Sequence, residues 1–197
     1  MIRAFVAVDL EPQTVQKIAG AIDLIRPRIP GIRWLAQGNF HLTLKFLGDI
    51  DEAKVEPIAA ALEHDLCPFS SCTINAKGLG VFPDLKRPRI LWVGLVGEEL
   101  NALAAAVEKA LIPLGFAAEK RAFAPHLTVG RWREFKGSPQ QLREAMANWQ
   151  NHEFGPTRVT EVILFQSVLK PEGAVYRRLK VIALRNRAPH HDGAPID

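Results

Sequence analysis

The chain has 197 residues, of which 48% are apolar and 23% charged, a composition that is typical of a globular protein and excludes a disordered one. Its formal net charge of +4 lies far below that of a dedicated duplex-binding domain, so we expect an anionic partner to be contacted locally. No run of about 18 apolar residues and no signal-peptide pattern occurs, which predicts a cytoplasmic protein that does not contact a membrane.

The first part of the chain predicts a strand, a helix and a second strand. Residues 3–9 form an apolar strand candidate. Pro12 then opens a stretch in which apolar residues recur at helical spacing as far as Ile25. After a connection rich in proline, a second strand is predicted over residues 41–47, closed by Gly48 and Asp49.

The same order of elements returns from Arg89 onward. Residues 90–96 are strand-like, residues 98–111 have helical spacing and residues 126–130 predict another strand. Between the two parts, residues 52–66 predict a helix, and residues 72–81 predict a strand that ends at Phe82-Pro83.

The C-terminal part predicts a helix followed by a hairpin. Ser138 and Pro139 have the pattern of an N-cap with proline at the first helical position. Residues 158–169 and 175–184 predict two strands, joined by a turn at residues 171–173. The polar tail, residues 188–197, is expected to be flexible, which leaves one domain over residues 1–187.

One motif occurs twice, each time inside a predicted strand and 85 positions apart: His41-Leu42-Thr43-Leu44 and His126-Leu127-Thr128-Val129. Six histidines are not expected to produce this pattern twice by chance. Since side chains of a strand alternate between faces, each copy presents an imidazole and a hydroxyl on the same face.

The spacing of the elements indicates an internal duplication. From Arg3 to His41 is 38 positions, and from Arg89 to His126 is 37. Such a duplication predicts a pseudo-twofold arrangement in which the two motif strands meet at a central cleft. The two histidines would then face one another.

Two opposed histidines supply the chemistry for hydrolysis of a phosphodiester. With ordinary pKa values near 6.5, one acts as a neutral base that activates water and the other as an acid that protonates the departing oxygen. Thr43 and Thr128 are candidate donors to the non-bridging phosphate oxygens. This reaction requires no metal and no cofactor, and we expect neither.

Other catalytic patterns are weak or missing in the sequence. Cys67, Cys72 and His64 are three weak ligands that do not define a metal site, and Asp49, Asp51 and Glu52 fit the start of a helix better than a metal cluster. No G-x-S-x-G elbow and no P-loop occur in the chain.

Two cations adjoin the motifs and are candidates for phosphate binding. Lys45 has the parity of His41, so simple alternation places it on the same face. Arg131 has the opposite parity to His126 and reaches a phosphate only if the strand ends or bends near Gly130.

These motifs resemble those of the 2H phosphoesterase superfamily, and within it the RNA 2′,3′-cyclic phosphodiesterases, formerly called 2′-5′ RNA ligases. The resemblance spans nearly the whole chain. It rests on the two motifs together with residues 3–10, 39–48, 89–95 and 125–131.

The resemblance implies a bilobal α+β fold in which two pseudo-symmetric antiparallel sheets, flanked by helices, surround a central cleft. It also implies hydrolysis of a terminal 2′,3′-cyclic phosphate of RNA to a 2′-phosphate. By carry-over, His41 donates the proton to the leaving 3′ oxygen, His126 activates water, and Thr43 and Thr128 hold the phosphate. The residues alone permit the reverse assignment of the two histidines.

Three alternative functions remain open at this point. They are reversible 2′-5′ ligation of tRNA halves without ATP, hydrolysis of a small cyclic nucleotide, and nucleotide or RNA binding without turnover. The expected partners are RNA ends or small cyclic nucleotides, and the chain is expected to be a monomer. Five aromatic residues are candidates for stacking on a base: Trp34, Phe40, Phe46, Phe82 and Tyr176.

Overall fold

The computed structural model describes residues 1–171 and 173–186. Within them, nine strands pair antiparallel in one curled sheet, in the order β7-β4-β5-β6-β3-β1-β8-β9, with β2 beside β6. The strands are β1 (Ile2–Asp9), β2 (Arg33–Trp34), β3 (His41–Ile50), β4 (Cys72–Phe82), β5 (Ile90–Val96), β6 (His126–Arg131), β7 (Glu153–Val159), β8 (Glu161–Lys170) and β9 (Gly173–Ala183). The helices are α1 (Pro12–Ile25), α2 (Val55–Leu66), α3 (Leu100–Leu111) and α4 (Pro139–Met146).

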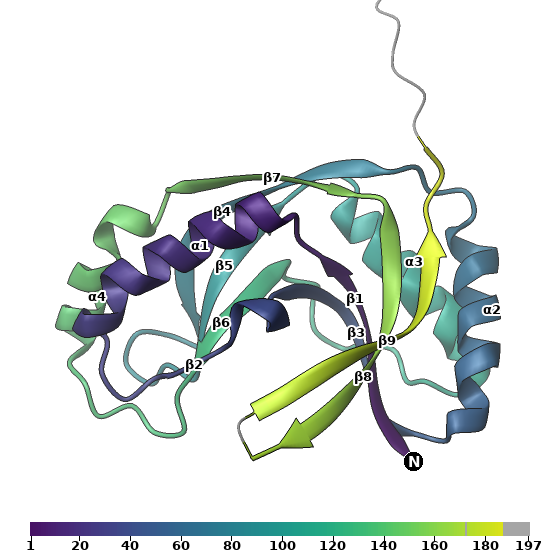
Figure 1. Ribbon diagram of the computed structural model, residues 1–197, viewed down its shortest axis with the longest axis horizontal. Helices are drawn as coiled ribbons and strands as arrows, with labels where there is room; N and C mark the ends of the chain where they lie inside the picture. Colours follow the sequence, from purple (N-terminus) through teal and green to yellow (C-terminus); the bar gives the residue numbers. More distant parts are fainter. Residues whose placement is uncertain (172, 187–197) are drawn as a thin grey trace, which may run out of the picture.

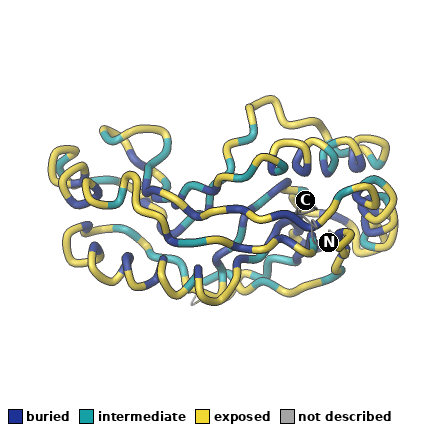
Figure 2. Tube along the Cα trace, turned by 90° about the horizontal axis from the view of Figure 1, so that it is seen from above, coloured by how far each residue is buried: buried dark blue, intermediate teal, exposed yellow. Residues whose placement is uncertain are grey.

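The sheet and helices form two lobes (Figure 1). The β1 lobe contains β3, β1, β8 and β9 with α2 and α3, and the β5 lobe contains β2, β6, β5, β4 and β7 with α1 and α4. The core lies between the helices and one face of the sheet, and exposed residues follow the outer turns of the helices (Figure 2). We call the other face, opposite the helices, the open face. This bilobal α+β architecture confirms the fold class predicted from the sequence.

Apolar stripes and local caps explain why the helices form and where they pack. In α1, Ile18, Ile22 and Ile25 lie on one face and are buried against the sheet. Each such side chain stabilises the fold by about 1.5–3 kcal/mol on burial. The predicted cap of α4 is present, because Ser138 Oγ accepts a hydrogen bond from the backbone N–H of Gln141.

The two motif strands have equivalent neighbours. Val8 of β1 lies opposite Leu42 of β3, and Val93 of β5 lies opposite Leu127 of β6. The lobes nevertheless exchange elements: α1 follows β1 in the chain and packs in the β5 lobe, whereas α3 follows β5 and packs against α2 and β3. The halves are therefore pseudo-symmetric and interlocked.

The main difference from the sequence prediction is β7. The sequence predicts one strand over residues 158–169, but β7 ends at Val159 and β8 begins at Glu161. β7 is an edge strand that pairs with β4 alone in the described chain, and such a strand tolerates Gly155 and Pro156, which hide it from a pattern search. The hairpin of β8 and β9 confirms the predicted one.

The helices of the described residues are short. The longest, α1, has 14 residues, and none is both long and apolar enough to cross a bilayer. The tail predicted over residues 188–197 lies outside the described residues.

Candidate functional site

The two histidine motifs meet at the centre of the sheet. β3 and β6 run antiparallel with Leu42 directly opposite Leu127, and both leucines are fully buried on the core face. Since neighbouring residues of a strand point to opposite faces, His41 and His126 lie on the open face, each followed by its threonine. Extending the register by one residue places each histidine opposite the threonine of the other motif.

Both imidazoles are oriented by the same backbone contact. Nδ1 of His41 lies 2.8 Å from the carbonyl oxygen of Asn39, and Nδ1 of His126 lies 2.7 Å from that of Ala124. A carbonyl only accepts, so Nδ1–H is the donor in each ring and Nε2 is the nitrogen left for chemistry. In the neutral state, each Nε2 therefore carries a lone pair.

The surroundings of the two rings differ. His41 lies among aromatic rings, with centroids 4.8 Å from Phe5, 5.0 Å from Tyr176 and 6.3 Å from Phe165. Burial among them lowers the pKa of His41 from 6.5 to about 4, because the imidazolium loses more solvation than the neutral ring does. The expectation of two histidines with ordinary pKa values is therefore wrong for His41.

Charged groups near His41 modify this effect. Asp9 lies opposite His41 in the β1–β3 register, and its carboxylate acts to raise the pKa of His41. Arg178 of β9 donates to Asp9 at 2.5 Å and to Glu161 at 2.9 Å, which fixes that carboxylate beside the ring. Arg131 acts in the opposite direction and lowers the pKa of His41.

In each motif strand, the residue directly after the threonine is an extra one. On β3, adjacent residues of β1 lie opposite Thr43 and Lys45, so Leu44 is extra. On β6, Val129 is the equivalent extra residue. A β-bulge of this kind reverses the faces of the residues that follow it.

The bulge in β3 turns Lys45 toward the core, so the prediction that it shares the face of His41 is wrong. Its side chain is 6% exposed, and Nζ donates to both carboxylate oxygens of Glu108, at 2.8 and 2.7 Å, and to the carbonyl of Ala117. All three donor hydrogens have partners within the fold. Lys45 therefore has a structural role at this position.

The bulge in β6 has the opposite consequence for Arg131. Thr128 lies opposite Trp92, and Arg131 lies opposite Ile90. Because Ile90 and Trp92 are two residues apart on β5, they share a face, and both pairs are therefore on the open face. The bend that the sequence analysis required near Gly130 is thus present. Arg131 is exposed on the open face, where its charge acts on both His41 and Tyr176.

The aromatic residues near His126 belong to β4 and β5. Phe82 meets the ring of His126 edge to face at 5.0 Å and lies 5.2 Å from Trp92. The Trp92 ring lies over Gly80, where a Cβ atom would overlap it. Gly80 therefore makes room for an indole on the open face.

The predicted stacking residues separate into two groups. Phe82 and Tyr176 contact the histidines, and Phe46 is 70% exposed on β3. Phe40 is buried in the core, and Trp34 packs against it. Phe5 and Phe165 were not predicted at the site, because only the pairing of β1 with β3 and with β8 brings them beside His41.

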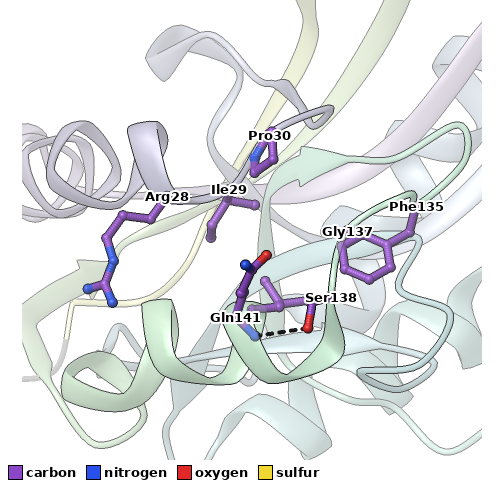
Figure 3. Close-up of a pocket in the computed structure, with 8 residues that line it drawn as sticks. Arg28, Ile29, Pro30, Phe135, Gly137, Ser138 and Gln141 are labelled. Atoms are coloured by element: carbon purple, nitrogen blue, oxygen red, sulfur yellow. Dashed lines mark hydrogen bonds between the residues drawn. The ribbon is translucent and has the colours of Figure 1, made fainter.

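A small hollow elsewhere on the molecule carries no such chemistry. It lies where the end of α1 meets the start of α4, between residues 28–30 and the Ser138 cap (Figure 3). Its volume of about 10 Å³ admits roughly one water molecule. None of the motif residues lines it.

The sequence of the chain matches a known protein family. A family model described as LigT-like phosphoesterase matches the chain twice, over residues 8–92 and 93–176. The chain belongs to the LigT-like phosphoesterase family. This confirms the resemblance predicted from the motifs, and each of the two matches contains one copy of the motif. The LigT-like family is one of hydrolases, so the prediction of an enzyme is also confirmed.

Several proteins are similar to this LigT-like phosphoesterase over nearly their whole length. The RNA 2′,3′-cyclic phosphodiesterase of Methanothermobacter thermautotrophicus is 33% identical over 93% of this chain and 99% of its own. The protein of the same name from Thermotoga maritima is 31% identical over 90% of this chain and 92% of its own.

Solved structures show the same fold at lower identity. A Thermus thermophilus protein superposes with a TM-score of 0.81 at 24% identity, covering 95% of this chain and 100% of its own. LigT of E. coli, crystallised with 3′-AMP, gives a TM-score of 0.75 at 24% identity, covering 93% of this chain and 98% of its own.

Proposed function

We propose that this phosphoesterase hydrolyses the 2′,3′-cyclic phosphate at the end of an RNA to a 2′-phosphate, without a metal ion. The observation that carries the proposal is the pairing of Leu42 with Leu127, from which both histidines and both threonines follow as neighbours on the open face. The names of the relatives from Methanothermobacter and Thermotoga support the choice of substrate.

The chemistry needs one proton accepted and one donated. Water attacks phosphorus and the bond to the 3′ oxygen breaks, while Nε2 of His126 takes the proton from water and Nε2 of His41 gives one to the 3′ oxygen. Thr43 and Thr128, with Arg131, donate hydrogen bonds to the non-bridging oxygens. Each positioned histidine contributes roughly 10²- to 10⁴-fold in rate.

The low pKa of His41 sets a condition on this assignment. With a pKa of about 4, His41 is neutral at pH 7 in the free protein and must gain a proton before it can act as the acid. We infer that the negative charge of the bound phosphate stabilises the imidazolium, so that His41 gains its proton when the substrate binds. In the reverse assignment, a neutral His41 accepts the proton of water.

The test of the proposed function is hydrolysis of a short RNA that ends in a 2′,3′-cyclic phosphate, with EDTA present. His41→Ala and His126→Ala should each lose at least about 100-fold in kcat. His64→Ala is the matched control, because its side chain is 87% exposed on α2. Phosphorus NMR should identify a 2′-phosphate as the product. Loss of activity in EDTA, or turnover unaffected by both motif variants, would contradict the proposal.

A substrate with sulfur in place of the 3′ oxygen assigns the two roles. A thiolate leaves without protonation, so the variant that lacks the acid should recover activity on this substrate and the variant that lacks the base should not. We expect recovery in His41→Ala. Recovery in His126→Ala instead would reverse the assignment and leave the reaction class unchanged.

A further inference from the structure

Two arginines lie opposite each other at one end of the site. β2 takes the place of β3 beside β6, where the backbone N–H of Leu35 donates to the carbonyl of Val129. In this short pair, Arg33 is directly opposite Arg131 and Trp34 is opposite Gly130. Side chains in directly opposed positions share one face and lie about 5 Å apart at Cβ.

The neighbours of Arg33 establish that this face is the open one. Ile32 and Trp34, on either side of it, pack against the core, and a Cβ atom at Gly130 would overlap the Ile32 side chain. Arg33 itself is exposed. Its Nη2 lies 3.4 Å from the position of a Cβ atom at Gly173, so its guanidinium extends to the start of β9.

Neither of the two arginines forms an ion pair in the described part of the chain. Among residues 1–171 and 173–186, no carboxylate forms an ion pair with either Arg33 or Arg131, although Arg3, Arg26 and Arg178 all have one. Like charges in directly opposed positions of a sheet destabilise it. An anion bound between the two guanidinium groups removes this repulsion and accepts hydrogen bonds from both.

The distance of the two arginines from the threonine that holds the reacting phosphate can be read from the strand register. Thr128 and Arg131 lie opposite Trp92 and Ile90, so the bulge leaves them two positions apart along the sheet, which is roughly 7 Å. This is the length scale of one nucleotide. The arginines lie beyond His41 and not beyond His126, because His41 is opposite Thr128 in the extended register.

We infer that Arg33 and Arg131 bind the phosphate on the 5′ side of the terminal ribose. The inference rests on the proposed function, in which His41 protonates the 3′ oxygen and the ribose therefore lies on the His41 side of the reacting phosphorus. Arg131 contacts both phosphates, whereas Arg33 contacts only the 5′ one. Arg33 thus determines specificity for substrates that carry this second phosphate.

Three substrates test this inference: a nucleoside 2′,3′-cyclic phosphate, the same compound with a 5′-phosphate, and a dinucleotide that ends in the cyclic phosphate. The wild type should turn over the second or third with a higher kcat/KM than the first. Arg33→Gln should reduce that preference about tenfold, as loss of one charge-assisted hydrogen bond predicts. Arg33→Lys should restore part of it, and the exposed Arg87→Gln is the matched control.

The pattern of results separates the possible outcomes. A preference for both phosphorylated substrates means that the site binds any 5′-phosphate, and a preference for the dinucleotide alone means that it binds the diester of an RNA chain. No preference in the wild type, or an equal loss on all three substrates in Arg33→Gln, overturns the inference.

Failure of the proposed function is distinguishable from failure of this inference. It appears as no turnover of any of the three substrates by the wild type. Calorimetry then tests the arginine pair with two probes, a nucleoside 2′-phosphate and a nucleoside 2′,5′-bisphosphate. Tighter binding of the bisphosphate that is lost in Arg33→Gln supports the inference, and equal affinities in the wild type overturn it.

Discussion

His41 and His126 each contact the backbone carbonyl two residues earlier in the chain, but the side chains around the two rings differ. The rings of Phe5 and Tyr176 exclude water from His41, and this loss of solvation is the largest cause of its lowered pKa. The pairing of similar groups in different environments is how one site provides both an acid and a base.

The pKa of His41 should rise when its aromatic surroundings are opened. In the wild type, His41 takes up its proton only as the pH falls through about 4. Tyr176→Ser admits water to the ring, which favours the charged form and should raise this midpoint by about one pH unit toward the ordinary 6.5. Titration of the imidazole carbon protons by NMR measures it directly.

Tyr176→Phe is the control for this titration, because it retains the edge-to-face ring and should leave the midpoint of His41 in place. A wild-type midpoint near 6.5, or an equal shift in both variants, would show that burial by aromatic rings does not govern the titration of His41. The expected low-pH limb of kcat/KM follows the same midpoint, provided that chemistry limits the rate.

Among the individual residues of the site, those of the repeated motif could be predicted from the sequence. His41, Thr43, His126 and Thr128 are recognisable because the motif occurs twice within strand-like segments. Phe165 carries no comparable signal, because its place beside His41 depends on which strands are neighbours in the sheet.

The two bulges are the elements that decide which charges reach the site. A period-2 pattern places Lys45 on the open face and Arg131 on the core face, and the structure reverses both. Nothing in the residue pattern marks Leu44 or Val129 as extra, since both are apolar residues in apolar strands. A bulge is visible only through the register with the neighbouring strand.

Replacing Lys45 should therefore affect stability far more than catalysis. Lys45→Met leaves the Glu108 carboxylate without its cation, and this should lower the free energy of unfolding by about 3 kcal/mol. The loss is expected at the lower end for a buried pair, because Glu108 is 23% exposed and regains some hydration. Urea denaturation measures the change, and kcat/KM of the folded variant should stay within a few-fold of the wild type.

Two further variants make this prediction specific. Lys77→Met removes one member of an exposed pair with Glu153 and should cost less than about 1 kcal/mol. Adding Glu108→Leu to Lys45→Met removes the unpaired carboxylate and should recover most of the lost stability. A large loss of kcat/KM with unchanged stability in Lys45→Met would instead place this lysine at the phosphate.

The two lobes are joined because helices and strands from one half of the chain pack in the lobe formed by the other half. The near-equal spacing of the motifs predicts the duplication, but not that α1 packs in the β5 lobe or that β8 pairs with β1. These pairings join residues far apart in the chain, and local sequence patterns contain no information on which of several compatible strands are neighbours.

This interlocking predicts that the lobes unfold together. All four tryptophans belong to the β5 lobe: Trp34 in β2, Trp92 in β5, Trp132 after β6 and Trp149 before β7. Their fluorescence therefore reports unfolding of that lobe, whereas far-UV circular dichroism reports the helices and strands of both lobes. Because α1 and α3 each link one lobe to the other, the two signals should give coincident urea transitions with one midpoint and one slope. Separate transitions, with fluorescence changing at a different urea concentration from circular dichroism, would show that each lobe is stable without the other.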